Sequence, residues 1–169
     1  LELLYAVEGQ PVEPDYDAFV EFYGNNIAGG SVPFPGLIAL LDRLQAAGIA
    51  MGVCTNKLES LSVRLLDALG MSKYFGAVVG PDTIGIAKPD PRPFAETLSR
   101  LGMSDGAAIM IGDSETDILT ARNAGVPVIG VPFGYTPKHV SAYGPDYVIE
   151  HFDEAWDVML KERPDIVVT

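Results

Sequence analysis

The chain has 169 residues, of which 48% are hydrophobic and 20% are charged, and its formal net charge at pH 7 is −12. This length and composition suit one domain with a sizeable core. The acidic balance argues against a nucleic-acid-binding surface, which needs clustered Lys and Arg, and no apolar run approaches the roughly 20 residues of a membrane-spanning helix. We therefore expect neither nucleic acid nor a membrane as a partner. Cys54 is the single cysteine, which excludes an intrachain disulfide and fits a cytoplasmic protein.

The spacing of apolar residues predicts helices and short strands that alternate along the chain. Helices are predicted at residues 16–27, 37–44, 58–69, 94–101, 118–124 and 154–161. Strands are predicted at residues 49–54, 77–80, 107–111, 126–131 and 147–150. This alternation is typical of βαβ units, so the predicted fold class is α/β with a mostly parallel sheet. The segment Pro33-Phe34-Pro35-Gly36 predicts a hinge between an N-terminal helical part, residues 1–32, and an α/β body, residues 33–169.

Polar side chains follow three of the predicted strands. Thr55-Asn56-Lys57 follows the first, Lys88-Pro89-Asp90-Pro91 lies in the loop after the second, and Asp113 with Asp117 follows the third. Because ligands of open parallel sheets bind outside the carboxyl ends of the strands, we expect these side chains to lie close together. A hydroxyl, an amide, a lysine and two carboxylates suit a phosphoryl group held with a magnesium ion.

The stretch Gly112 to Asp117 also fits a purely structural role. Asp113 or Ser114 could cap the helix that follows, and Glu115 would then favour its first turn. Taken by itself, the stretch leaves a helix cap and a cation site equally open.

The three motifs, in this order and at these strand ends, resemble the second, third and fourth motifs of haloacid-dehalogenase-type phosphatases. The resemblance runs from about Pro33 to Asp157. Within that superfamily, Cys54-Thr55-Asn56-Lys57, the hinge and Phe133-Gly134-Tyr135 are most similar to bacterial phosphoglycolate phosphatases. The resemblance implies a Rossmann-like three-layer α/β/α core, and it identifies residues 15–29 as the remnant of a small helical cap.

The resemblance also implies roles for the motif residues that would meet the substrate. Thr55 would donate a hydrogen bond to a phosphoryl oxygen, and Asn56 would bind the same group through its backbone N–H or its side chain. Lys57 would add positive charge near the substrate, with a solvated lysine as the alternative. Lys88 would offset the negative charge of the nucleophile and of the phosphoryl group. Thr55 and Lys88 are therefore the expected catalytic residues, with a structural alternative for Thr55 as the cap of the helix near Leu58.

The two carboxylates would form the magnesium site. Asp113 would bind Mg²⁺ directly, and Asp117 would bind it through water or orient Lys88. The implied reaction is magnesium-dependent phosphomonoester hydrolysis through an aspartyl-phosphate, with a small phosphorylated metabolite, 2-phosphoglycolate, as the substrate. The alternatives are another phosphatase, a pyrophosphatase or a phosphosugar mutase of the same superfamily, or a catalytically silent scaffold.

The first motif of that family, Asp-x-Asp-Gly-Thr after an apolar strand, is absent from this sequence. In the family it supplies the nucleophile and the general acid, and it forms the central strand. Asp15-Tyr16-Asp17 follows polar residues and enters a helical pattern, so we interpret Asp15 as a helix N-cap. We expect the motif upstream of Leu1 in a longer natural protein; alternatively the tail, residues 165–169, fills the strand position, or a partner chain does. A vacant position would leave unpaired backbone groups and an apolar seam.

Overall fold

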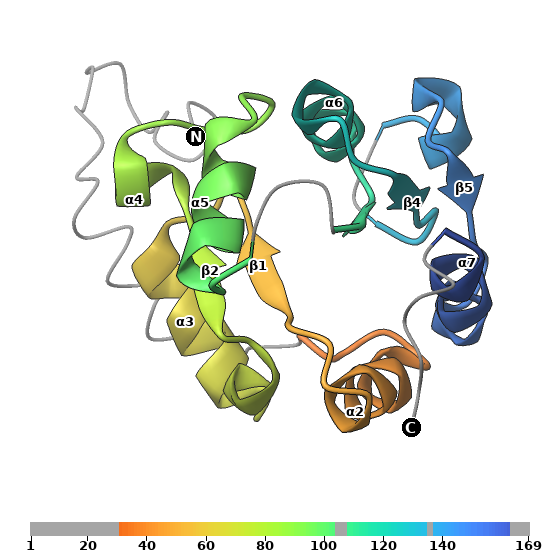
Figure 1. Ribbon diagram of the computed structural model, residues 1–169, viewed down its shortest axis with the longest axis horizontal. Coiled ribbons are helices and arrows are strands. Elements are labelled where there is room, and N and C mark those ends of the chain that lie inside the picture. Colours follow the sequence, from red (N-terminus) through yellow and green to blue (C-terminus); the bar gives the residue numbers. More distant parts are fainter. Residues whose placement is uncertain (1–30, 104–107, 135–136, 163–169) are drawn as a thin grey trace, which may run out of the picture.

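The computed structural model describes residues 31–103, 108–134 and 137–162, which form helices packed on short parallel strands (Figure 1). The helices are α2 (Leu37–Ala46), α3 (Glu59–Ala68), α4 (Pro81–Ile84), α5 (Arg92–Arg100), α6 (Glu115–Ala124) and α7 (Ala155–Glu162). The strands are β1 (Gly52–Cys54), β2 (Ala77–Val79), β3 (Met110–Gly112), β4 (Val128–Gly130) and β5 (Tyr147–Val148). The predicted α/β class is confirmed. The predicted helix 16–27, the cap remnant and the tail strand lie outside the described residues.

The described strands form two parallel sheets. In one, β1 pairs with β2, and Gly52 lies opposite Ala77. In the other, the order is β3-β4-β5, and Met110 lies opposite Val128. Among the described strands, β1 therefore pairs on one edge only, and so does β3.

Helices cover both faces of the strands and give the expected three layers. On one face, Phe94 and Leu98 of α5 and Ile118 of α6 pack with Met110 and Val128. On the other face, α2 and α7 pack on β4 and on the residue that follows β5, through Leu40, Leu44, Ile129, Ile149 and Trp156. Helix α2 also carries Leu41 into a smaller cluster with Met71 and Tyr74, beside Leu66 and Leu69 at the end of α3. Helix α2 thus contributes to two clusters, and α5 packs on β1 and β2 as well.

An apolar cavity of about 390 Å³ lies between β1 and β3. We call it the strand slot. Its walls come from the two strands and from α2, α5 and α7, and include Leu44, Val53, Phe94, Ile109, Ile111 and Met159. The slot has the place and the apolar character that the sequence analysis expects of a vacant central strand, and its natural occupant stays a prediction.

The structure refines several predicted boundaries. Helix α6 begins at Glu115 rather than at residue 118, because Ser114 accepts a hydrogen bond from the Asp117 backbone and caps it. Helix α4 was not predicted, and its four residues are too few for a periodic pattern to show. Within the described ranges, no helix is long and apolar enough to cross a bilayer.

Candidate active site

The site is built where β1 and β3 end and where the loop after α4 comes between them. Thr55 follows β1 directly, Asp113 follows β3 directly, and Lys88 reaches both ends from its loop. The Lys88 Nζ donates to the Cys54 carbonyl oxygen at 2.8 Å and to Asp117 Oδ1 at 2.5 Å. The predicted convergence of three strand-end motifs is therefore seen in the contacts of a single ammonium group.

Lys88 and Asp117 form a buried ion pair. Each side chain is 8% exposed. The second oxygen of Asp117, Oδ2, accepts hydrogen bonds from the Ser114 backbone at 3.0 Å, from the Ser114 hydroxyl at 2.6 Å and from the Asp113 backbone at 3.2 Å. Both carboxylate oxygens thus accept hydrogen bonds, which favours the expected role of Asp117 in orienting Lys88 over its other expected role, binding a cation through water.

The residues after β1 form a tight turn. Thr55 Oγ1 accepts a hydrogen bond from the Lys57 backbone at 3.0 Å. Thr55 is not the cap of α3, because the N-cap position is Leu58 and the Glu59 backbone instead donates to Asp82 Oδ1 at 2.8 Å.

Since the Thr55 oxygen accepts, its proton remains available for an acceptor outside the turn. The side chain of Asn56 bonds the main chain of Lys88, whereas its expected contact with a phosphoryl group, and that of Lys57, stay predictions.

Two glycines make room for the two carboxylates. A Cβ added to Gly134 would lie 1.8 Å from Asp113 Oδ2, and one added to Gly112 would lie 2.4 Å from the Asp117 Cβ. The half-buried Asp113 therefore rests against the main chain of the loop after β4. That loop is anchored by Phe133, whose ring packs between Phe34 and Phe152 at centroid distances of 4.9 and 5.2 Å. Phe133 thus packs against the core, while Tyr135 lies outside the described residues.

The environment of the site also changes the acidity of two neighbouring groups. Burial raises the pKa of the Cys54 thiol, and the nearby Lys88 charge opposes the rise without cancelling it. In the Lys88 loop, hydrogen bonds from Arg92 lower the pKa of Asp90 to about 2. The Asp90 carboxylate also accepts a hydrogen bond from the backbone of Arg92, the first residue of α5, at 2.9 Å.

Among the described residues, no three His, Cys, Asp or Glu side chains come together as a complete cation site. This suits Mg²⁺ if the ion is held by one or two carboxylates and takes its other ligands from water and substrate phosphate. Asp113 fits such a ligand, because its carboxylate lies at the carboxyl end of β3, where the lack of a side chain on Gly134 makes room for it.

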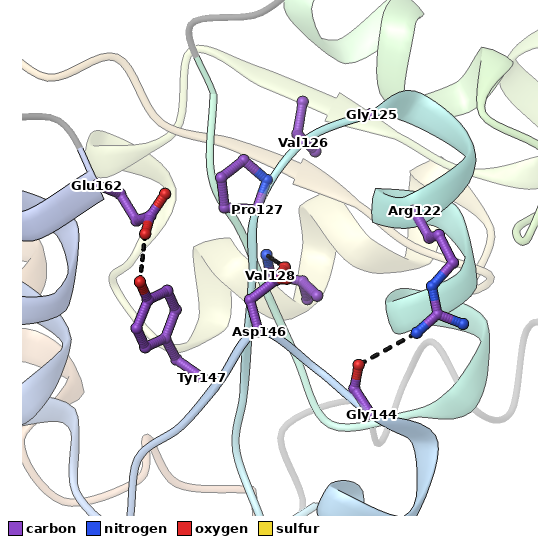
Figure 2. A pocket seen from close by; sticks show the side chains of 9 residues that line it. All are labelled: Arg122, Gly125, Val126, Pro127, Val128, Gly144, Asp146, Tyr147 and Glu162. Carbon is purple, nitrogen blue, oxygen red and sulfur yellow. Dashed lines mark hydrogen bonds between the residues drawn. The ribbon is translucent and has the colours of Figure 1, made fainter.

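A second hollow, of about 490 Å³, lies at the amino ends of β4 and β5, away from the carboxyl ends where the site is built. Figure 2 shows its lining from residues 125–128, before and at the start of β4, and from Gly144, Asp146 and Tyr147 around the start of β5. Its polar groups bond one another: Arg122 donates to the Gly144 carbonyl at 3.1 Å, and the Tyr147 hydroxyl donates to Glu162, which raises the pKa of Tyr147. Because ligands of parallel sheets bind at the carboxyl ends, this hollow is not the candidate site.

Three residues that support the site are not predicted from the sequence as parts of it. The sequence predicts Ser114 as a helix cap and contains Gly134 in a motif, and it offers no pattern that points to Asn123. Asn123 donates to the Pro89 carbonyl at 3.0 Å across a long stretch of sequence. No local pattern signals such a contact, whereas the Ser114 to Asp117 spacing does signal a capping box.

Known proteins resemble this chain in both sequence and structure. Residues 2–131 match the family model of the haloacid dehalogenase-like hydrolases. The chain is 47% identical over 145 residues to a phosphoglycolate phosphatase of Mesorhizobium japonicum, covering 86% of this chain and 63% of that protein. It is 44% identical over 157 residues to a phosphoglycolate phosphatase of Caulobacter vibrioides, covering 90% of this chain and 66% of that protein. The chain thus spans about two thirds or less of the length of these relatives.

Solved structures agree with the fold. The crystal structure of a predicted phosphoglycolate phosphatase from Haemophilus somnus superposes with a TM-score of 0.80 at 27% identity, covering 89% of this chain and 69% of that one. A phosphatase structure from Thermococcus onnurineus superposes with a TM-score of 0.70 at 25% identity, covering 88% of this chain and 66% of that one. The three-layer arrangement of strands and helices is therefore shared with these proteins.

Proposed function

Because the chain belongs to the haloacid dehalogenase-like hydrolase family, we propose that its whole protein is a magnesium-dependent phosphomonoester hydrolase that acts on 2-phosphoglycolate. The observation that carries the proposal is the position of Lys88, whose ammonium contacts the end of β1 and the buried Asp117 together. The substrate rests on the relatives from Mesorhizobium japonicum and Caulobacter vibrioides, which are phosphoglycolate phosphatases. The single cysteine, half-buried Cys54, supports a reducing, cytoplasmic setting.

Each motif residue has a task in this proposal. The Thr55 hydroxyl donates to a phosphoryl oxygen, and Lys88 offsets the charge that gathers on the phosphoryl group. Asp113 holds Mg²⁺, which when bound neutralises phosphoryl oxygens. Asp117 keeps the Lys88 ammonium in place. The nucleophilic carboxylate of the family's reaction would come from the Asp-x-Asp motif, which this sequence does not contain.

The test is phosphate release by the protein as its gene encodes it. We expect release from 2-phosphoglycolate to exceed release from pyrophosphate and from glucose 1-phosphate. We also expect EDTA to stop the release and added Mg²⁺ to restore it. Release from another phosphate ester in preference would keep the reaction class and change the substrate. No release from any ester, by a folded protein with Mg²⁺, would favour the catalytically silent scaffold.

The Asp113→Asn variant tests the metal site itself. The substitution keeps the shape of the side chain and removes its charge, so the Mg²⁺ concentration that gives half-maximal release should rise. Glu115→Gln is the matched control, because Glu115 is an exposed acid two residues away. Equal effects of the two substitutions would contradict the assignment of Asp113.

A further inference from the structure

The Lys88 main chain is held by one side chain through both of its polar groups. Asn56, which lies just after β1, donates from Nδ2 to the Lys88 carbonyl oxygen at 3.1 Å. Its Oδ1 accepts from the Lys88 backbone N–H at 2.8 Å. The amide of Asn56 thus pairs with Lys88 as a neighbouring strand would, although 32 residues separate the two positions.

A second asparagine holds the same loop from the other sheet. Asn123 lies in α6, which packs on β3 and β4, and it donates from Nδ2 to the Pro89 carbonyl oxygen at 3.0 Å. The side chain of Lys88 repeats this pattern, because its Nζ bonds Cys54 of β1 and Asp117 of α6. The segment from Lys88 to Pro89 therefore bridges the two sheets at their carboxyl edge, next to the strand slot.

We propose that Asn56 is a positioning residue that fixes the Lys88 main chain, and that its side chain does not bind the phosphoryl group. Turning the Asn56 side chain toward a substrate would break both bonds to Lys88 and leave a backbone N–H and C=O to find new partners. A lysine side chain loses much rotamer entropy when it is ordered, so a fixed main chain helps to keep its ammonium at one point. The proposal rests on the proposed function, since it gives Asn56 a part in the same reaction.

The first test measures the main chain and needs no turnover. In the protein as its gene encodes it, hydrogen–deuterium exchange of the Lys88 amide should be at least about 10-fold faster in Asn56→Ala, because the amide loses its only acceptor among the described residues. The Asp90 amide, which donates to the Ala87 carbonyl at 3.2 Å, is the reference within the same loop. Asn123→Ala is the matched control, since Asn123 contacts a carbonyl only and should leave the Lys88 amide protected. Unchanged exchange of the Lys88 amide in Asn56→Ala would overturn the proposal.

The second test separates positioning from substrate binding. A positioning role predicts that Asn56→Ala lowers kcat by about 10- to 100-fold, as misplaced catalytic groups do, while KM changes by less than about 2-fold. A phosphoryl-binding side chain predicts a raised KM with no change in Lys88 amide exchange, and that pair of results would overturn the proposal. If the parent protein releases no phosphate from any ester, the proposed function fails, and the exchange experiment still decides whether Asn56 holds Lys88.

Discussion

At the scale of single residues, the buried pair of Lys88 and Asp117 has a structural cost when it is broken. Removing one partner of a buried ion pair leaves the other charge uncompensated, which costs about 3–5 kcal/mol. Lys88→Met should therefore lower the free energy of unfolding by about that amount as well as abolish phosphate release. This differs from a lysine that acts on the substrate alone, whose loss would leave stability unchanged.

A double variant separates the two effects. Lys88→Met combined with Asp117→Asn removes both charges, so most of the lost stability should return while phosphate release stays absent. Urea unfolding of the parent, the single variant and the double variant measures this. If the double variant is no more stable than Lys88→Met, the pair does not contribute to stability as its burial indicates.

Gly134 gives a second prediction, which concerns the cation. An added methyl group would lie 1.8 Å from Asp113 Oδ2, so Gly134→Ala must displace that carboxylate. We expect the Mg²⁺ requirement for phosphate release to rise about 10-fold or more, the size of effect seen when support of a metal ligand is lost. The comparison variant is Gly48→Ala, at φ +69° with open space around it, which strains the backbone without touching the site. Gly48→Ala should lower stability and leave the Mg²⁺ requirement unchanged, and the reverse pattern would refute the role of Gly134.

The site residues that could be predicted are those that a local pattern exposes. A strand end or the loop after a strand carries each of Thr55, Lys88, Asp113 and Asp117. The parallel arrangement then brings these strand ends together. The partners of these residues could not be predicted in the same way. The contacts of Asn56 with Lys88 and of Asn123 with Pro89 join segments more than 30 residues apart, and they depend on how the two sheets are packed.

At the scale of elements, the start of α6 serves the helix and the site together. Ser114 caps the helix, and its hydroxyl also donates to Asp117 Oδ2. Of the two roles that the sequence left open for this stretch, the helix cap is thus carried by Ser114, and the cation site at Asp113 stays a prediction.

Ser114→Ala tests this shared role. It should cost about 1 kcal/mol in the free energy of unfolding for the lost cap. It should also lower kcat, because Asp117 would hold Lys88 less firmly. Ser99→Ala, an exposed serine inside α5, should change stability by less than about 0.5 kcal/mol. Equal losses in the two variants would contradict the capping role.

The helices and strands predicted within the described residues were found, and their ends were the least predictable part. The strands are shorter than the apolar runs that predicted them, since a strand ends where pairing ends and an apolar run continues into the core. Ile109 shows this, because it precedes β3 and lines the strand slot instead of pairing. The start of α3 could not be predicted from local sequence either, because the carboxylate that accepts from the Glu59 backbone belongs to Asp82 of α4.

At the scale of the whole molecule, the strand slot predicts which kind of segment can fill the space between β1 and β3. The slot lies between β1 and β3, which each pair on one edge only among the described strands, and its walls are apolar on both faces. A segment that enters it as a strand would be covered by helices on both sides, which suits a continuous apolar run. If no segment of the 169-residue chain fills the slot, this chain should bind a hydrophobic dye such as ANS without denaturant, whereas a slot filled by the tail, residues 165–169, should leave the dye unbound.

A chimera tests whether a strand fills the slot. The segment that precedes the matched residues in the Mesorhizobium japonicum relative would be fused before Leu1, and we expect dye binding to fall and the urea midpoint to rise. Val53→Asp, on the wall of the slot, sharpens the comparison. In the chimera it would bury a carboxylate without a partner, at a cost of several kcal/mol, whereas in the 169-residue chain the carboxylate would meet water in an open slot and cost less. Equal losses of stability in the two proteins would mean that the added segment does not enter the slot.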